Sequence, residues 1–323
     1  MKLSQVGEFG LIDLISKYQS RNKTTMVGIG DDAAVLQMTN DKCQMSNEIP
    51  IPKFPTPNSK PPTPNKYLLI TTDALVENVH FKKKGLSFYH LGQKALLANI
   101  SDIAAMGGIP THAVITIGLP KNTNVQDIKE LYRGINAVAK KNKIDIVGGD
   151  TVASPRAMFI SITLLGEVEK EYLLLRSGAK PGDLICVTGA FGGAAAANYE
   201  SRIPKSRISE ARRIANEILA SAMIDSSDGL VRSVVEICRA SKVGAVIEEN
   251  KIPIAKGATL QQALYGGEEY ELIFTVPAKN IKKLKEFNIV GRIVPKKNGI
   301  KLEDKHGKIK RLNSYGYEHF YGK

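Results

Sequence analysis

The sequence predicts a mixed α/β (α+β) protein with two domains, and three observations lead to this prediction. The chain has 323 residues, whereas a typical domain holds roughly 100–200 residues. Short apolar, β-branched runs alternate along it with segments of helical periodicity. A turn-rich segment at 176–183, RSGAKPGD, opens the second half. We therefore expect an N-terminal domain over residues 1–165 and a C-terminal domain over residues 166–323.

The first half contains four predicted strands and two predicted helices. The run YLLITT at 67–72 is apolar and β-branched, as expected for a buried strand. Residues 88–106 have helical spacing and stop at Gly107-Gly108, shortly before Pro110. A second amphipathic helix is predicted at 125–141, and further strands are predicted at 111–119, 144–147 and 157–166.

A proline-rich segment interrupts the first half. Residues 50–64 hold 7 of the 15 prolines. Proline removes a backbone donor and restricts the residue before it, so neither a helix nor a central strand fits this segment. We expect an extended loop over residues 40–66 that joins two strands, and a PxxP ligand motif is the less favoured interpretation.

The second half continues the alternation of strands and helices. A strand is predicted at 184–188 and is followed by a Gly/Ala-rich stretch at 189–197. Two helices are predicted near 207–222 and 229–240, and two more strands are predicted near 244–248 and 270–276.

The net charge of +13 raises the question of whether the chain binds nucleic acid. The charge is uneven: residues 1–165 carry +6, residues 166–278 carry −2 and residues 279–323 carry +9. A nucleic-acid-binding protein would show a basic stripe with interleaved aromatic residues, and aromatics are only 6% of this chain. We therefore expect no nucleic-acid partner, and a basic C-terminal region that is a solvated surface and steers small anions.

Other composition features predict a cytoplasmic protein with no membrane partner. No stretch approaches the roughly 18–20 apolar residues of a membrane span. The N-terminus has no continuous apolar core of the kind found in signal peptides. The three cysteines, Cys43, Cys186 and Cys238, form no CxxC pair, so a disulfide framework and a zinc ribbon are not expected.

Acidic residues lie beside Gly, Ser or Thr in five short clusters, most of which end a strand-like run. Clustered carboxylates at strand ends suit Mg²⁺, which takes oxygen ligands and is usually shared between carboxylates and substrate phosphates. Adjacent glycines let the backbone approach a phosphate closely. The clusters are GIGDDAAV at 28–35, TTD at 71–73, SD at 101–102, GGDT at 148–151 and IDSSDGL at 224–230.

Each cluster alone also has a structural explanation. A single Asp-Gly or Gly-Asp pair most often forms a turn, and Asp31-Asp32 would also cap a following helix. Asp102 differs, because Ile100 and Ile103 surround it and an acidic group in such a setting needs a partner or an ion. The five clusters together favour a phosphate site that holds several metal ions.

Motifs of several other catalytic classes are absent from the sequence. It contains no GxxxxGK[ST] P-loop, no HRD or DFG set, no GxSxG and no HExxH. Gly28-Ile29-Gly30 lacks the third glycine of a dinucleotide-binding fingerprint. The five histidines are scattered, and a lone histidine is more often structural than catalytic.

Further motifs run in order over nearly the whole chain. They are GEFGLI at 7–12, GIGDDAAV, TTDALVENVHF at 71–81, KALLANISDIAAMGGIP at 94–110, IVGGDT at 146–151, RSGAKPGD, IDSSDGL, GGEEYELIFTV at 266–276 and GYEHF at 316–320. This ordered set resembles the thiamine-monophosphate kinase family. Members of the wider superfamily, which includes aminoimidazole ribonucleotide (AIR) synthetase and selenophosphate synthetase, share an N-terminal α/β domain that pairs in a dimer and a C-terminal α/β domain.

This resemblance implies phosphorylation of thiamine monophosphate by ATP in a homodimer, with ATP and several Mg²⁺ ions held between the domains. The positions that match the family's metal ligands are Asp32, Thr71, Thr72, Asp73, Asp102, Asp150, Asp225 and Asp228. Those that match nucleotide contacts are Gly149, Asp150, Arg176 and Ser227. Those that match substrate contacts are His80, Glu268 and Tyr317.

The implied chemistry agrees with the residue inventory. The acceptor is a phosphate oxygen that is already anionic, so the reaction needs no general base and no covalent nucleophile. The main obstacle is repulsion between two anions, which metal ions held by carboxylates relieve. We expect direct in-line transfer, with catalysis by positioning and electrostatics.

The sequence departs from the family at three places, and sister enzymes remain alternatives. The proline-rich stretch is longer than expected, Glu269 stands where Asp is common, and no Trp precedes the final Gly-Tyr. A selenophosphate synthetase would need a reactive N-terminal cysteine, and the first here is Cys43. A hydrogenase-maturation relative would end in cysteine, whereas this chain ends FYGK, and AIR synthetase lacks the TTD…NVHF and GGEEYEL combination.

Overall fold

We describe the protein from a computed structural model, which describes residues 3–16, 23–38, 65–83, 87–199, 203–312, 316 and 319. The proline-rich segment at 50–64 lies outside the described residues, so its expected loop conformation stays a prediction.

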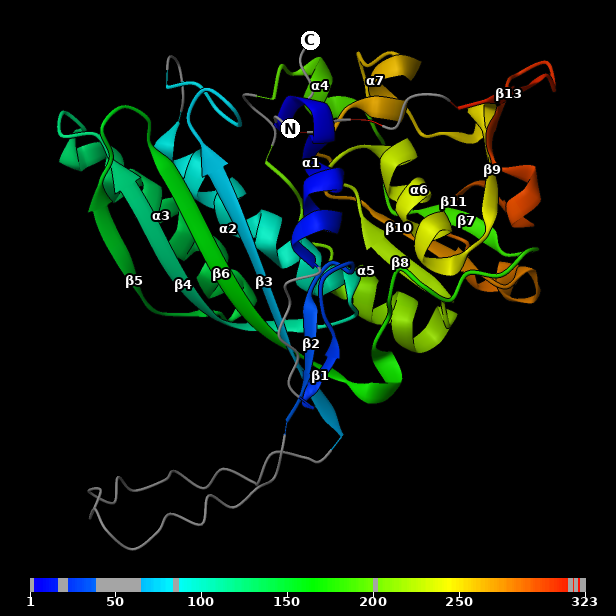
Figure 1. The fold of residues 1–323 in the computed structure, drawn as a ribbon, viewed down its shortest axis with the longest axis horizontal. Helices are drawn as coiled ribbons and strands as arrows, with labels where there is room; N and C mark the ends of the chain where they lie inside the picture. The colour runs from blue at the N-terminus through cyan, green and yellow to red at the C-terminus, as the bar shows by residue number, and fades with distance from the viewer. Residues whose placement is uncertain are drawn as a thin grey trace, which may run out of the picture.

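The N-terminal part is built on a six-stranded sheet with the order β1-β2-β3-β6-β4-β5 (Figure 1). All neighbouring strands are antiparallel except β4 and β5, which are parallel. The strands are β1 (Thr25–Val27), β2 (Ala34–Gln37), β3 (Lys66–Val76), β4 (Ile109–Leu119), β5 (Asp145–Ala153) and β6 (Phe159–Glu169).

Two long helices, α2 (Phe88–Ala105) and α3 (Val125–Asn142), cover one face of this sheet (Figure 1). They approach closely at Gly92 and Gly134, where a Cβ atom would meet the backbone of the other helix. Side chains along β6 alternate between buried and half-buried, because one face of the sheet meets the helices and the other remains open.

The C-terminal part is built on a seven-stranded sheet with the order β13-β12-β9-β11-β7-β10-β8. Strand β10 (Leu272–Val276), second from one edge of the sheet, is buried along its whole length. The other strands are β7 (Leu184–Val187), β8 (Ala222–Asp225), β9 (Gly244–Glu248), β11 (Asn288–Val294), β12 (Ile300–Glu303) and β13 (Ile309–Arg311). The helices are α4 (Gly193–Ala196), α5 (Ile208–Arg213), α6 (Leu230–Ser241) and α7 (Leu260–Tyr265).

The first helix, α1 (Leu3–Ile15), packs on the C-terminal part although it begins the chain. The backbone breaks at Gly7, whose φ of 70° is in the left-handed region that favours glycine. The Arg232 guanidinium lies 3.2 Å from the centre of the Phe9 ring, and Arg239 forms an ion pair with Asp13. These contacts bring the N-terminal segment against α6.

Helix α2 joins the cores of the two parts. Leu96 and Ile100 belong to the N-terminal core, whereas Ala104 and Ala105 pack in a second core with Phe274 of β10. Burial of both ends of one helix holds the two sheets in a fixed relation. Of the described residues, no helix is long and apolar enough to cross a membrane.

The predicted helices at 88–106 and 125–141 and the strand at 111–119 are confirmed, but two strands are longer than predicted. The strand at 67–72 continues as β3 through the TTD motif, and the strand at 144–147 continues as β5 through GGDT. In both cases pairing with neighbouring strands extends the element, and at Gly148-Gly149-Asp150 it does so through a sequence typical of a turn.

The helix predicted at 207–222 is wrong beyond Ile218. Helix α5 passes into a π-helical turn at Ile214–Ile218, and Leu219 ends it in a left-handed conformation (φ 58°). Residues from Ala222 onward form β8, which is buried at the sheet edge. The predicted domain boundary at 165 falls inside β6, which runs to Glu169.

Candidate active site

Strand β3 and helix α2 place the first carboxylates of the site. Thr71 and Asp73 alternate with Thr72 along β3 and therefore face the helices. The Thr71 hydroxyl donates a 2.5 Å hydrogen bond to Asp102 Oδ2 of α2. The Asp73 amide donates to the side-chain oxygen of Asn99, one turn earlier on α2, at 3.1 Å. These two contacts fix the TTD strand to the helix that carries Asp102.

The C-terminal part contributes Asp225 to the same place. Asp225 is the last residue of β8, and its carboxylate accepts a 2.7 Å hydrogen bond from the Ser101 hydroxyl of α2. Its main-chain carbonyl accepts from the Ser233 hydroxyl at 2.8 Å. The SD motif of α2 therefore contacts both parts of the chain: the Ser101 hydroxyl donates to Asp225, and the Asp102 carboxylate accepts from Thr71.

Asp32 completes the cluster from the loop before β2. Its side chain is completely buried, and Oδ1 accepts a 2.7 Å ion-paired hydrogen bond from Arg176. The Arg176 backbone amide also donates to the neighbouring Asp31 carboxylate at 3.2 Å. Asp32 Oδ2 has no hydrogen-bond partner although it is buried. An unpaired buried carboxylate oxygen is unfavourable unless an ion or a ligand meets it.

Asp32, Asp102 and Asp225 form a carboxylate cluster with one oxygen from each lying within 4.8 Å of the others. Burial, reinforced by the neighbouring carboxylates, raises the pKa of Asp102 and of Asp225 well above the usual range. Burial also raises the pKa of Asp73 to about 6 and that of Asp31 to about 7. This donor set, all oxygen with one unpaired atom, fits Mg²⁺.

The IDSSDGL loop continues from β8 into α6 and borders the cluster. Burial and then the Glu8 charge raise the pKa of Asp228 to about 7. The exposed Ser227 accepts a 2.6 Å hydrogen bond at its main-chain oxygen from the Glu268 amide. The loop therefore places Asp228 near the carboxylates and ties them to the GGEEYEL segment.

A second group of polar side chains contains His80 and Glu268. His80 Nδ1 accepts a 3.0 Å hydrogen bond from the Val76 amide, so the proton of the neutral ring is on Nε2. Burial, with the nearby His319 and Lys94, lowers the pKa of His80 to about 4. Lys94 of α2 forms a 2.7 Å ion pair with Glu268. Tyr317, the third predicted substrate contact, lies outside the described residues.

Three predicted residues are not brought to the cluster within this one chain. Thr72 faces the open side of the sheet, where its hydroxyl donates to the Ile162 carbonyl. Gly149 and Asp150 lie on the edge strand β5, three strands from β3, which corresponds to about 14 Å. Asp150 aligns across the sheet with Ala74, so its exposed side chain points to the same open face as Thr72.

Several residues that shape the site were not predicted from the sequence. Ser101 and Asn99 hold Asp225 and the Asp73 amide, and Lys94 pairs with Glu268. Tyr270 is buried beside the carboxylates with a left-handed φ of 54°. Ser101 and Asp102 follow Lys94 by seven and eight residues, about two helical turns, and this spacing was the available signal for a polar stripe on α2.

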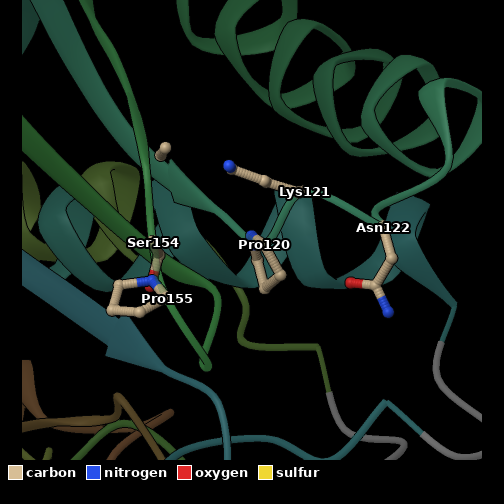
Figure 2. A pocket seen from close by; sticks show the side chains of 6 residues that line it. Pro120, Lys121, Asn122, Ser154 and Pro155 are labelled. Atoms are coloured by element: carbon tan, nitrogen blue, oxygen red, sulfur yellow. The ribbon is translucent and has the colours of Figure 1, made fainter.

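A separate pocket of about 450 Å³ lies where β4 and β5 end (Figure 2). Pro120 and Lys121 line one side of it, and Ser154 and Pro155 line the other. It contains none of the predicted site residues.

Comparison with known proteins agrees with the two-part architecture. Residues 30–168 match the family model for the AIR synthase related protein, N-terminal domain, and residues 180–302 match that for the C-terminal domain. A solved structure of AaThiL complexed with AMPPCP and TMP superposes with a TM-score of 0.79 at 29% identity, covering 99% of both chains. Hydrogenase maturation protein HypE in complex with ATP has a TM-score of 0.67 at 18% identity, over 79% of this chain and 87% of HypE, which shows the fold alone.

Comparison with curated relatives identifies one family among the AIR synthase related proteins. The thiamine-monophosphate kinase of Buchnera aphidicola subsp. Schizaphis graminum is 34% identical over 97% of this chain and 99% of its own length. That of Bacillus subtilis is 32% identical over 86% of each chain, and that of Pyrococcus horikoshii is 36% identical over 80% of this chain and 88% of its own. The chain belongs to the thiamine-monophosphate kinase family of AIR synthase related proteins.

Proposed function

We propose that this chain transfers the γ-phosphoryl group of ATP to thiamine monophosphate and releases ADP and thiamine diphosphate. The observation that supports it most is the buried carboxylate cluster with its unpaired Asp32 oxygen, formed where the two parts of the chain meet. A structurally similar relative binds AMPPCP, an ATP analogue, together with TMP.

The carboxylates Asp32, Asp73, Asp102, Asp225 and Asp228, with Thr71, would hold Mg²⁺. When bound, Mg²⁺ neutralises charge on the two phosphate groups that must approach each other. The chain supports this role by keeping the carboxylates in place: Ser101 orients Asp225, and Thr71 orients Asp102. These hydrogen bonds fix the ligand oxygens before substrate arrives, which is the condition for electrostatic preorganisation.

The transfer step itself requires little from the protein beyond orientation. The acceptor oxygen of a phosphate monoester is anionic near neutral pH, so no side chain has to remove a proton. The described residues Cys186 and Cys238 are buried with a raised pKa of about 12, so neither is poised as a nucleophile. We propose direct in-line displacement, with Arg176 and Ser227 holding the nucleotide.

The acceptor would lie between the carboxylate cluster and the second polar group. His80 presents its Nε2 proton and Glu268 presents a carboxylate, and both are near enough to interact with Lys94. Thiamine monophosphate is elongated, with phosphate at one end and an aminopyrimidine ring at the other. We propose that the phosphate faces the Asp cluster and that His80, Glu268 and Tyr317 contact the organic part.

We propose that the enzyme is a homodimer in which a second copy covers the open face of the N-terminal sheet. That face carries Thr72 and Asp150, which the single chain leaves away from the cluster, and the exposed apolar residues Val114 and Val152. Pairing of two such faces would bury the apolar side chains. It would also allow Gly149 and Asp150 to serve the nucleotide site of the other protomer.

The activity is tested by incubating the purified protein with ATP, Mg²⁺ and thiamine monophosphate and separating the products by chromatography. We expect equal amounts of thiamine diphosphate and ADP. Absence of the diphosphate, together with phosphorylation of a different acceptor, would refute the proposed substrate. Isolation of a phosphorylated enzyme after incubation with ATP alone would refute direct transfer.

The shared site is tested by mixing two inactive variants. We expect Asp102→Asn and Asp150→Asn each to lose activity as homodimers. If the two residues serve one site from different protomers, mixed dimers contain one intact site and about a quarter of the wild-type activity returns. A mixture that stays inactive, although sedimentation shows exchanged dimers, would place both residues in one chain's site.

A further inference from the structure

Lys94 is a buried cation that the proposed reaction does not yet use. Only 7% of the residue is exposed, and it lies on α2 among apolar neighbours of the N-terminal core. Burying an ammonium group is unfavourable unless a partner compensates its charge. Its partner is Glu268 of the C-terminal part, with Nζ 2.7 Å from Oε2. The ion pair therefore links the two parts of the chain.

The place of Lys94 along α2 separates it from the phosphate chemistry. Asp102 follows Lys94 by eight residues, which corresponds to about 12 Å along the helix axis. Helical side chains also lean toward the N-terminus, which carries the Lys94 ammonium farther from Asp102. A phosphate bound at the carboxylate cluster is thus beyond the direct reach of Lys94.

His80 provides a hydrogen-bond donor and Glu268, the partner of Lys94, provides an acceptor. Burial lowers the pKa of His80, and the charges of His319 and Lys94 add to this shift, so the imidazole is neutral. His80 Nδ1 is occupied by the Val76 amide, which leaves Nε2–H as a donor. Glu268 Oε2 is occupied by Lys94, and among the described residues no donor is bonded to Oε1.

The backbone of Glu268 is also held in an unusual state. Its φ is 61°, in the left-handed region that glutamate rarely adopts, and its amide donates a 2.6 Å hydrogen bond to the Ser227 carbonyl. Such strain persists only where the surroundings over-determine the conformation. The backbone bond fixes one end of the residue, and Lys94 fixes the carboxylate at the other.

We propose that Lys94 is a positioning residue that orients the Glu268 carboxylate toward the organic end of the acceptor. The chemical class that fits is a nitrogen heterocycle with an amino group, which donates to Glu268 Oε1 and accepts from His80 Nε2. Lys94 therefore selects the acceptor without touching its phosphate. This inference rests on the proposed function, since it concerns the same acceptor.

The test compares Lys94→Met with Lys66→Met, which removes an ion pair with Glu167 on the same domain at 3.0 Å. For Lys94→Met we expect KM for thiamine monophosphate to rise at least tenfold, with kcat and KM for ATP within about twofold of wild type. Lys94→Arg should restore most of the loss, and Lys66→Met should change none of the three constants. An unchanged KM for the acceptor in Lys94→Met would overturn the proposal.

A shortened acceptor separates positioning from general structural damage. With a thiazole-ethyl phosphate that lacks the pyrimidine ring, we expect wild type and Lys94→Met to have the same KM. An equal loss for both acceptors would mean that Lys94 only supports the fold. If Lys94→Met does not fold, the double variant Lys94→Met with Glu268→Gln removes both charges of the pair. Its KM for thiamine monophosphate should equal that of Glu268→Gln alone. A higher KM in the double variant would refute the pairing role of Lys94.

Binding measurements by calorimetry distinguish failure of this inference from failure of the proposed function. If wild type binds thiamine monophosphate without phosphorylating it, the proposed function fails and the Lys94→Met dissociation constant still decides the role of Lys94. If wild type does not bind the compound, both proposals are overturned.

Discussion

Replacing Asp102 by Asn removes one charge from the centre of the carboxylate cluster while preserving its size. The side chain receives the Thr71 hydroxyl at 2.5 Å, and the carboxylates of Asp32 and Asp225 each place an oxygen within 4.8 Å of one of its own. An asparagine oxygen accepts the same hydrogen bond, so the fold should persist. The substitution therefore tests the charge of Asp102 apart from its packing.

The magnitude follows from the separation of the charges. Two unit charges 4.8 Å apart interact by about 3.5 kcal/mol at an effective dielectric constant of about 20. A cation held between these carboxylates would lie no farther than this from Asp102, so its attraction would be at least of this size. Losing that attraction in the transition state lowers the rate by about 300-fold or more, since about 1.4 kcal/mol is tenfold. Without metal the same charge is repulsive, so its removal should stabilise the fold by about 1–3 kcal/mol after protonation has relieved part of the repulsion.

Two assays measure these opposite effects in one variant. Steady-state formation of thiamine diphosphate at saturating ATP and Mg²⁺ gives kcat, and thermal unfolding in EDTA gives the stability of the metal-free protein. We expect kcat to fall at least about 300-fold and the unfolding temperature in EDTA to rise by several degrees. Asp145→Asn, the same change at an exposed position, should alter neither quantity.

Near-normal turnover in Asp102→Asn would refute the proposal that the carboxylate cluster holds the catalytic metal ions. A lower unfolding temperature in EDTA would refute the reasoning in a different way, because it would mean that the Asp102 charge stabilises the metal-free fold. Only the combination of slower turnover and higher metal-free stability agrees with a site built to hold cations.

Three further predictions concern charge in the same region. Because the pKa of Asp73 is raised to about 6 and that of Asp31 to about 7, the folded protein binds more protons than the unfolded chain between about pH 4 and 7. The stability of the metal-free protein should therefore fall as pH rises through this window, and Mg²⁺ should raise the unfolding temperature more at pH 8 than at pH 5.5. Arg176→Met leaves Asp32 without its 2.7 Å partner, so KM for ATP should rise at least tenfold in initial-rate assays while KM for thiamine monophosphate stays constant. The pKa of His80 is lowered from 6.5 to about 4, so its contribution to stability is complete above pH 6.5 and is lost as pH falls toward 4; urea unfolding of His80→Asn at pH 7.5 and pH 5 should show a smaller difference than wild type.

The long helices and the central carboxylates were predictable because their signals are local. Helix α2 stops at Gly107, whose positive φ and small size suit a helix end, as the Gly-Gly pattern indicated. Asp102 could be singled out because an acid within an apolar helix needs a partner, and the structure supplies Thr71. In the structure, Asp32, Asp102 and Asp225 each place one oxygen within 4.8 Å of the others.

The parts that could not be predicted depend on contacts between distant segments. Gly148-Gly149-Asp150 has the composition of a turn, yet parallel pairing with β4 keeps it extended as β5. Lys94 was not singled out from the sequence, because its partner Glu268 lies 174 positions away along the chain. The strands after residue 284 were likewise not predicted, and they pair within the C-terminal sheet with strands distant in the sequence.

Helix α2 carries residues that we propose to act at both ends of the acceptor. It carries Lys94 at one end of the site and Ser101 and Asp102 at the other, about 12 Å apart, and it is buried in both cores. The partners Glu268 and Asp225 come from the C-terminal part and meet this helix at those two points. Because the length of a helix is fixed, the distance between the carboxylate cluster and the Lys94–Glu268 pair is constant. If the proposed site holds the acceptor at both points, we expect acceptors of a different length to satisfy one end only, and the spacing of residues on this single helix would then contribute to substrate selection.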